Sequence, residues 1–235
     1  MKIALLGYGK MGKEIESILV DRGHEAVAKF GSAGIDKKEL SKADVAIEFS
    51  RPEIAFENIK SCIELNIPVV IGTTGWLDKY EEASSLCLDQ NSAMLYSSNF
   101  SLGVNLFFEI NKKLAVLMQP HRAYKVEMEE IHHTQKLDAP SGTAISLAQQ
   151  IMDVSERWKS WTLDDNDIDE EIPIVAKRIE NIPGTHSIAY NSEIDSIEIK
   201  HTAHNRKGFA LGAVVAAEFI NGKQGIFTMK DVLKI

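Results

Sequence analysis

The sequence predicts an α/β protein with two domains, and three observations lead to this prediction. A glycine-rich turn lies between an apolar strand and an amphipathic helix at the start of the chain. Short apolar strands then alternate with amphipathic helices through the first hundred residues, which is typical of a doubly wound parallel sheet. After Phe100 the alternation gives way to a long helix and neighbouring strands, which favours an α+β domain with a mixed or mostly antiparallel sheet. We expect domains over 1–101 and 102–208, with 209–235 returning to the first domain.

The glycine-rich turn is the first element that points to a ligand. The strand "KIALL" (Lys2–Leu6) runs directly into "GYGKMG", and apolar residues then recur at helical spacing. In the G-x-G-x-x-G spacing the first glycine permits the tight turn, the second admits a pyrophosphate and the third lets the helix pack on the strand. Such glycines also occur in turns without a ligand, but the strand-to-helix context predicts a Rossmann-like dinucleotide-binding domain. The expected coenzyme contacts here are Gly7, Tyr8, Gly9, Lys10, Met11 and Gly12.

Four further apolar strands are expected in the first domain: Ala26–Phe30, Val45–Phe49, Val69–Ile71 and Ala93–Tyr96. Amphipathic helices are expected at Ile54–Leu65 and Leu77–Leu88. Small polar residues follow the last two strands, in "GTTG" and "SSNFS". The carboxyl ends of parallel strands line the crevice where ligands bind, so these turns extend the predicted coenzyme site. Its members are Gly72, Thr73, Thr74, Ser97, Ser98, Asn99 and Phe100.

The end of the second strand bears on the choice of coenzyme. An NAD-preferring fold has an acidic residue there for the ribose 2′-hydroxyl. This chain reads "AVAKFGSAG" with no acid before Asp36, so Lys29 or Ser32 could contact a 2′-phosphate. We expect NADPH to be usable, and NADH stays an open alternative.

The second domain is expected to begin with a helix at Leu102–Met118. A strand over 123–133 and a helix at Gly142–Val154 follow. Three strands complete the domain, at Ile174–Ile182, Thr185–Tyr190 and Glu193–His201. The acidic stretch "LDDNDIDEEI", which precedes these three strands, is expected to be a solvated loop. The later stretch "FALGAVVAAEFI" is expected to be a helix that packs on the first domain.

The stretch "EEIHHTQKLDAPSGTA" (Glu129 to Ala144) gathers unusual chemistry in a few residues. Ser141 is a good helix N-cap, and the N–H groups behind it at Gly142 and Thr143 can bind an anion such as a carboxylate. Lys136 adds a positive charge to the same loop. A capped helix with water on these groups is the structural alternative, but the neighbouring histidines and the lysine favour a site for an anionic ligand.

Strand alternation predicts that Glu130 and His132 share one face, together with Tyr124, Val126 and Met128. We therefore hypothesise that Glu130 orients the His132 ring and raises its pKa. A zinc site is a competing interpretation, and the distant His201 and His204 could supply ligands. However, the chain lacks H-E-x-x-H, and Lys136 would repel a dication, so no metal is expected.

Composition limits the remaining function classes. The net charge of −8 argues against nucleic acid or a membrane as a general partner. Two cysteines, Cys62 and Cys87, cannot form a disulfide framework and are expected to be buried free thiols. The N-terminal segment does not resemble a signal peptide, and no apolar run reaches the roughly 20 residues that span a bilayer. We expect a soluble, cytoplasmic protein.

The central stretch resembles the dihydrodipicolinate reductase signature E-x-H-H-x-x-K-x-D-A-P-S-G-T-A. The similarity extends over nearly the whole chain, through "GYGKMG", "FSRP", "GTTGW", "SSNFS" and "KQGIFTMKDVL". It implies reduction of a cyclic dicarboxylate to tetrahydrodipicolinate with NADH or NADPH, on the way to diaminopimelate and lysine. It also implies that His132 donates or accepts a proton, that Lys136 donates one, and that the protein is a homotetramer associating through the second domain's sheet. The implied substrate contacts are His133, Ser141, Gly142 and Thr143. The chain has Lys10 where the family commonly has arginine.

Two other functions compete with the reductase. One is a non-catalytic dinucleotide-binding regulator that senses redox state, which would not need a proton donor beside an anion site. The other is a different two-domain dehydrogenase acting on an amino acid or semialdehyde, which would share the glycine turn but not the doubled anion site.

Overall fold

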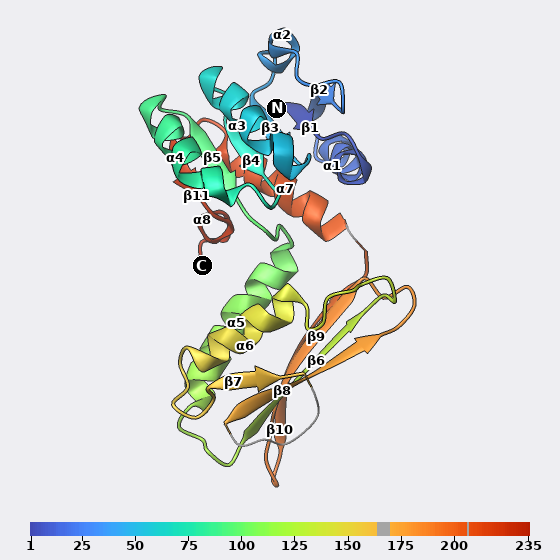
Figure 1. Ribbon diagram of the computed structural model, residues 1–235, viewed down its shortest axis with the longest axis vertical. Coiled ribbons are helices and arrows are strands. Elements are labelled where there is room, and N and C mark those ends of the chain that lie inside the picture. Colours follow the sequence, from blue (N-terminus) through green and yellow to red (C-terminus); the bar gives the residue numbers. More distant parts are fainter. Residues whose placement is uncertain (164–169, 206) are drawn as a thin grey trace. The chain divides into compact units, whose positions relative to one another are not determined.

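The computed structural model describes residues 1–163, 170–205 and 207–235 (Figure 1). The chain divides into two compact units: Met1–Leu102 together with Lys207–Ile235, and Gly103–Arg206. Residues 164–169, which belong to the acidic stretch predicted as a solvated loop, lie outside the described residues.

The first unit is built on a parallel six-stranded sheet in the order β11-β5-β4-β3-β1-β2. The five strands predicted from apolar runs are confirmed. The structure adds β11, which was not predicted from the sequence and pairs with β5. The strands are β1 (Lys2–Leu6), β2 (Glu25–Phe30), β3 (Val45–Glu48), β4 (Val69–Ile71), β5 (Ala93–Tyr96) and β11 (Gly225–Phe227).

Helices cover both faces of this sheet, as alternation along its strands requires. In β1, Ile3 and Leu5 face one core and Ala4 and Leu6 the other. The first core is closed by α1 (Lys10–Asp21), α7 (Lys207–Ile220) and α8 (Met229–Leu233). The second is closed by α2 (Lys37–Leu40), α3 (Pro52–Glu64) and α4 (Tyr80–Asp89). The predicted helix at Leu77–Leu88 is divided into a short 3₁₀ turn, η1 (Leu77–Lys79), and α4. Cys62 and Cys87 are buried free thiols, as predicted.

The second unit packs two helices on a five-stranded mixed sheet in the order β10-β9-β6-β8-β7. The β6–β9 and β9–β10 pairs are antiparallel, whereas β6–β8 and β7–β8 are parallel. The sheet is therefore mixed, which is one of the two alternatives expected from the sequence. The reason is that β8 follows β6 through a crossover containing α6 rather than through a hairpin. The elements are α5 (Leu102–Met118), β6 (Lys125–His132), α6 (Gly142–Met152), β7 (Ser160–Thr162), β8 (Glu171–Arg178), β9 (Gly184–Asn191) and β10 (Ser196–Ala203).

The predicted strand at Ile174–Ile182 runs too far at its C-terminal end. The strand ends at Arg178, and a turn follows in which Asn181 has φ +62°. That conformation is left-handed, which a continuing strand does not allow.

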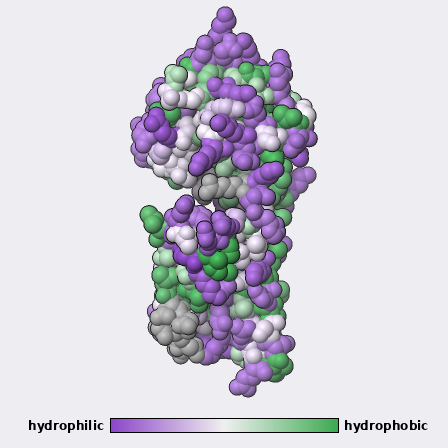
Figure 2. All heavy atoms as spheres, turned by 90° about the vertical axis from the view of Figure 1, so that its right-hand side faces the viewer, coloured by the Kyte–Doolittle hydropathy of each residue, from purple (hydrophilic) through white to green (hydrophobic). Residues whose placement is uncertain are grey.

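The core of the second unit lies between the sheet and the two helices. It contains Val126 and Met128 of β6, Ile188 of β9, and Leu147 and Ala148 of α6. The opposite face of the sheet carries more polar residues, among them Glu127 and Glu129. The molecular surface seen in Figure 2 is predominantly hydrophilic. Across the described ranges, none of the helices combines the length and the apolar character needed to cross a bilayer.

Candidate active site

The site in the second unit is built on the covered face of β6. Val126, Met128, Glu130 and His132 alternate with more exposed residues and all are buried, which confirms the predicted face. The first two contribute to the apolar core, and the last two stand at the carboxyl end of the strand. The neighbouring strands also place polar residues at this end of the sheet. The register sets His186 of β9 opposite Glu130 and Arg178 of β8 opposite His132.

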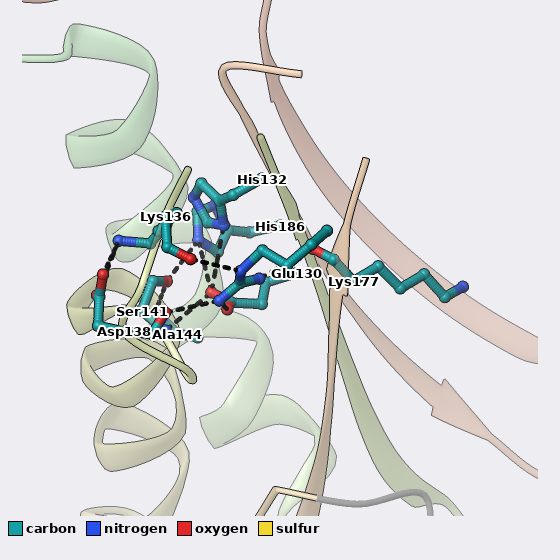
Figure 3. A network of polar contacts seen from close by, with 9 residues as sticks. Glu130, His132, Lys136, Asp138, Ser141, Ala144, Lys177 and His186 are labelled. Carbon is teal, nitrogen blue, oxygen red and sulfur yellow. Dashed lines mark hydrogen bonds and ion pairs between the residues drawn. The ribbon is translucent and has the colours of Figure 1, made fainter. Parts of the chain in front are cut away.

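Glu130 is the centre of the polar cluster in Figure 3. Its side chain is fully buried and accepts two hydrogen bonds. The Ser141 backbone N–H donates to Oε2 at 3.0 Å, and Arg178 Nη2 donates to Oε1 at 3.1 Å. Burial alone would raise the pKa of Glu130, but the bonds from Ser141 and the positive charges around it outweigh burial and lower that pKa. Glu130 is therefore a buried carboxylate at neutral pH.

His132 lies beside this carboxylate, as the sequence suggested, with Nδ1 3.6 Å from Glu130 Oε2. Its Nδ1 is buried and has no hydrogen-bond partner among the described residues. Glu130 does raise the pKa of His132, as hypothesised, but the net pKa is lowered. Burial lowers the pKa of His132 and the charge of Glu130 opposes this, while Lys136, Arg178 and His133 lower the pKa further. The imidazole is therefore neutral in the free chain at neutral pH.

His186 completes the cluster and is not among the residues predicted from the sequence. Its ring lies 5.0 Å from that of His132, edge to face, and its Nε2 is 3.1 Å from Ser141 Oγ. Burial is the main cause that lowers the pKa of His186 to about 4. A neutral Nε2 can accept a hydrogen bond from the Ser141 hydroxyl group. Ser141 Oγ in turn accepts a hydrogen bond from the Ala144 N–H at 3.2 Å. The alternation of His186, Ile188 and Tyr190 along β9 was the available signal for this buried position.

The segment from His133 to Ser141 carries the predicted cation and the predicted helix cap. Ser141 is the N-cap of α6, as expected, and Gly142 and Thr143 head the helix, where N–H groups have no intrahelical acceptor. Lys136 Nζ lies 2.8 and 2.7 Å from the two carboxylate oxygens of Asp138. That ion pair lowers the pKa of Asp138. Lys136, which was predicted to meet an anionic ligand, is thus paired with Asp138.

The same cluster contains a set of atoms with metal-ligand spacing. Within the described part of the chain, the ligand atoms of Glu130, His132 and His186 lie within 4.8 Å of one another. The distant His201 and His204, considered from the sequence, do not belong to this group. The Arg178 guanidinium already supplies a cation at the Glu130 carboxylate, and a dication would have to compete with it.

The coenzyme turn lies in the first unit, and its three glycines have different surroundings. Gly7 has φ +97°, and a Cβ there would lie 2.0 Å from the Phe49 carbonyl oxygen. A Cβ at Gly12 would lie 2.5 Å from the Gly7 carbonyl oxygen, whereas a Cβ at Gly9 meets nothing within 4 Å. The fold itself thus requires Gly7 and Gly12. The open space at Gly9, at the N-cap of α1, fits a pyrophosphate that approaches the backbone.

Lys29, the predicted contact for a 2′-phosphate, has a partner in the structure. Its ammonium forms an ion pair with Glu16 of α1, to which the Tyr8 hydroxyl also donates a hydrogen bond. The Lys29 Nζ lies 5.3 Å from the centroid of the Tyr8 ring. An acidic residue therefore does reach the end of β2, but from the helix. An acid on a neighbouring helix leaves no signal in the sequence of the strand itself.

The remaining predicted coenzyme residues follow β4 and β5. Thr73 accepts the Ser50 N–H at 2.8 Å, and the Ser97 hydroxyl donates to the Asn99 carbonyl at 2.8 Å. These bonds shape the turns. The Phe100 side chain is 2% exposed and packs on Phe49, so its ring belongs to the core and only its backbone remains for a ligand. Gly72, Thr74 and Ser98 lie in the same two turns.

Comparison with known proteins identifies the family. Models described as "Dihydrodipicolinate reductase, N-terminus" and "Dihydrodipicolinate reductase, C-terminus" match residues 1–100 and 103–233. The 4-hydroxy-tetrahydrodipicolinate reductase of Christiangramia forsetii is 58% identical over 235 residues, covering 99% of this chain and 98% of the relative. That of Thermosipho africanus is 35% identical over 239 residues, covering 100% of this chain and 98% of the relative.

A solved structure agrees with these matches. The dipicolinate-bound dihydrodipicolinate reductase from Paenisporosarcina sp. TG-14 superposes with a TM-score of 0.80 at 25% identity, covering 97% of each chain. The similarity thus includes both units and the segment from Glu129 to Ala144. The chain belongs to the dihydrodipicolinate reductase family.

Proposed function

We propose that the protein reduces 4-hydroxy-tetrahydrodipicolinate to tetrahydrodipicolinate with NADH or NADPH, in the pathway to diaminopimelate and lysine. The observation that carries this proposal is the joining of Glu130, His132, Lys136 and the α6 N-terminus in one short, partly buried segment. A regulator that only binds a dinucleotide has no use for such a set. Membership of the reductase family supports the same activity.

The substrate is a dicarboxylate, so the site needs donors for negative oxygens. Lys136, His133, Ser141 and the Gly142 and Thr143 N–H groups are the proposed contacts, and charge-assisted hydrogen bonds are about twice as strong as neutral ones. Lys136 would then exchange Asp138 for a substrate carboxylate.

Replacing the 4-hydroxyl group by hydrogen consumes a hydride and a proton and releases water. The nicotinamide coenzyme supplies the hydride when it is bound. We assign proton transfer to Lys136 as donor and to His132 as donor or acceptor. His132 is neutral in the free chain, but a dianion bound beside it adds negative charge and raises its pKa, so the imidazole can take up a proton on substrate binding.

The test is coenzyme oxidation by the purified protein, followed at the nicotinamide absorbance, with substrate made in situ by the preceding synthase. The wild type is expected to oxidise NADH or NADPH only when substrate is formed. His132→Gln and Lys136→Ala should each lower kcat by about 10²-fold or more. His121→Gln and Lys113→Ala, outside the site, serve as matched controls. Absence of substrate-dependent oxidation with either coenzyme would refute the proposed activity.

Coenzyme choice is proposed to depend on Lys29 and on the carboxylate that neutralises it. Lys29→Met should reduce kcat/KM for NADPH more than for NADH, because a 2′-phosphate loses a cation. Glu16→Ala should raise the ratio of kcat/KM for NADPH to kcat/KM for NADH, since Lys29 then lacks the Glu16 carboxylate. Equal ratios in the two variants and the wild type would show that Lys29 does not contact the 2′-phosphate.

We also propose that the protein is a cytoplasmic homotetramer that associates through the open face of the second unit's sheet. This face has a hollow lined by residues of four strands, including Glu127, Val175, Ala189 and Glu198. Family resemblance supports the assembly. Light scattering should give four times the mass of one chain, and Ala189→Arg in the middle of the face should lower it.

A further inference from the structure

Arg178, at the end of β8, was not singled out from the sequence, yet it contacts three residues of the site. Its side chain is 21% exposed. Its Nε donates to the Lys136 carbonyl at 3.2 Å, and Nη2 donates to the Asp138 carbonyl at 2.6 Å and to Glu130 Oε1 at 3.1 Å. Nη1 donates to the Lys177 carbonyl at 2.9 Å. One guanidinium thus joins the two ends of the Lys136–Asp138 pair to the buried carboxylate.

Glu130 performs the complementary task at the other end of the same segment. Its Oε2 accepts the Ser141 N–H, which is the last backbone donor before α6 begins. Segment 133–141 is therefore attached at Lys136 and Asp138 through Arg178, and at Ser141 through Glu130. The neighbouring side chain on β8 shows the contrast, because Lys177 pairs with Glu129 and points away from the cluster (Figure 3).

We propose that the Glu130–Arg178 ion pair is the positioning device of this site, holding segment 133–141 in the conformation that presents Lys136 and the α6 N-terminus to the substrate. The inference rests on the proposed reductase function, and both members are positioning residues. Lysine cannot replace Arg178 fully, because a single ammonium lacks the planar fork that serves a carboxylate and two carbonyl groups together.

The two charges of this pair also act on the titration of the neighbouring His132. His132 faces Glu130 on its own strand, Arg178 on β8, His186 on β9, and His133 and Lys136 in the following segment. Glu130 raises the pKa of His132 and Arg178 lowers it. Removing the two partners should therefore move the His132 pKa in opposite directions: upward in Arg178→Met and downward in Glu130→Gln.

The experiment compares Arg178→Met, Arg178→Lys, Glu130→Gln and the double variant Arg178→Met/Glu130→Gln with the wild type. Arg157→Met is the matched control, because Arg157 also donates to a backbone carbonyl, that of Arg122, in the same unit. Thermal unfolding establishes a temperature at which all variants are folded. Hydrogen–deuterium exchange of segment 133–141, the His132 pKa by NMR, dipicolinate affinity and steady-state kinetics are then measured.

We expect Arg178→Met and Glu130→Gln to speed exchange in segment 133–141 by at least tenfold and to weaken dipicolinate binding by at least tenfold. NADH affinity should change by less than twofold, because the coenzyme turn belongs to the other unit. For both exchange and dipicolinate affinity, Arg178→Lys should give values between those of the wild type and Arg178→Met. The fold loss of dipicolinate affinity in the double variant should be smaller than the product of the two single-variant losses, since each single substitution already breaks the same ion pair.

Unchanged exchange in segment 133–141, or dipicolinate affinity within twofold of wild type in Arg178→Met and Glu130→Gln, would overturn the proposal. If Arg178→Met does not fold, Arg178→Lys and Glu130→Gln decide by the same measurements. A wild-type protein without reductase activity would refute the proposed function, whereas the exchange measurement would still decide whether the pair positions the segment.

Discussion

Gly184, the first residue of β9, sets the space available to the His132 ring. A Cβ at this position would lie 3.1 Å from His132 Nε2 and 3.2 Å from its Cδ2, closer than ordinary van der Waals contact. The backbone of Gly184 does not have a positive φ, so alanine is conformationally permitted there. The packing of the imidazole, rather than the backbone, requires the glycine.

Gly184→Ala should therefore displace the His132 ring by a few tenths of an ångström without unfolding the unit. Because small misplacements of catalytic groups are costly, we expect kcat to fall about tenfold. Thermal unfolding should show a folded protein, and NADH affinity should stay at the wild-type value. A wild-type kcat would show that the ring position does not limit the reaction.

His186 couples the site to stability. Its folded-state pKa of about 4 lies below the ordinary 6.5, so the unfolded chain binds one more proton between these values. The free energy of unfolding should therefore fall as the pH drops from about 6.5 to about 4, by about 3 kcal/mol from this residue.

Denaturant unfolding across this pH range tests the coupling. His186→Gln, which does not titrate, should flatten the pH dependence of the free energy of unfolding. Equal slopes in wild type and His186→Gln would contradict a buried neutral histidine.

At the scale of elements, α7 packs closely on the turn after β5. A Cβ at Gly212 would lie 1.7 Å from the Phe100 carbonyl oxygen, so the helix can approach only with glycine at this position. Gly208 lies in the same helix, and a Cβ there would meet Ser101 Oγ at 3.8 Å, which is an ordinary contact.

Alanine substitutions at the two glycines should therefore change the stability of the protein in opposite directions. Gly212→Ala should destabilise the protein by about 1–3 kcal/mol through overpacking. Gly208→Ala should be neutral or stabilise it by up to about 1 kcal/mol, because alanine is the better helix former. Equilibrium denaturation measures both. Equal effects of the two substitutions would mean that α7 does not lie against the Phe100 carbonyl group.

Elements with a regular apolar period could be predicted from the sequence, and those decided by tertiary contacts could not. The first five strands of the first unit, the α5 helix and the covered face of β6 follow from period and composition. The parallel pairing of β6 with β8 depends on the route of the crossover, and β11 on a partner distant in sequence. Neither leaves a local signal.

The candidate site divides in the same way. Ser141 and the β6 residues Glu130 and His132 were predictable, since capping and alternation are local. Arg178 and His186 reach the cluster from other strands, and Glu16 reaches Lys29 from a helix. Their contributions depend on register, which the sequence alone did not establish.

For the whole molecule, the net charge has the same sign as the proposed ligand. The chain carries −8, yet its proposed ligand is a dianion. Local cations resolve this conflict, because Lys136 and Arg178 lie in segments that also offer backbone N–H groups. In the free chain these cations are matched by Asp138 and Glu130, so the site is prepared without an excess of buried positive charge.

Calorimetric titration of dipicolinate into the NADH-loaded protein, with wild type compared to Lys136→Ala, tests directly whether Lys136 meets the dicarboxylate. We expect one site per chain in the wild type and at least tenfold weaker binding in Lys136→Ala, because a charge-assisted hydrogen bond is lost. Equal affinities in the two proteins would show that the dicarboxylate binds elsewhere than at segment 133–143.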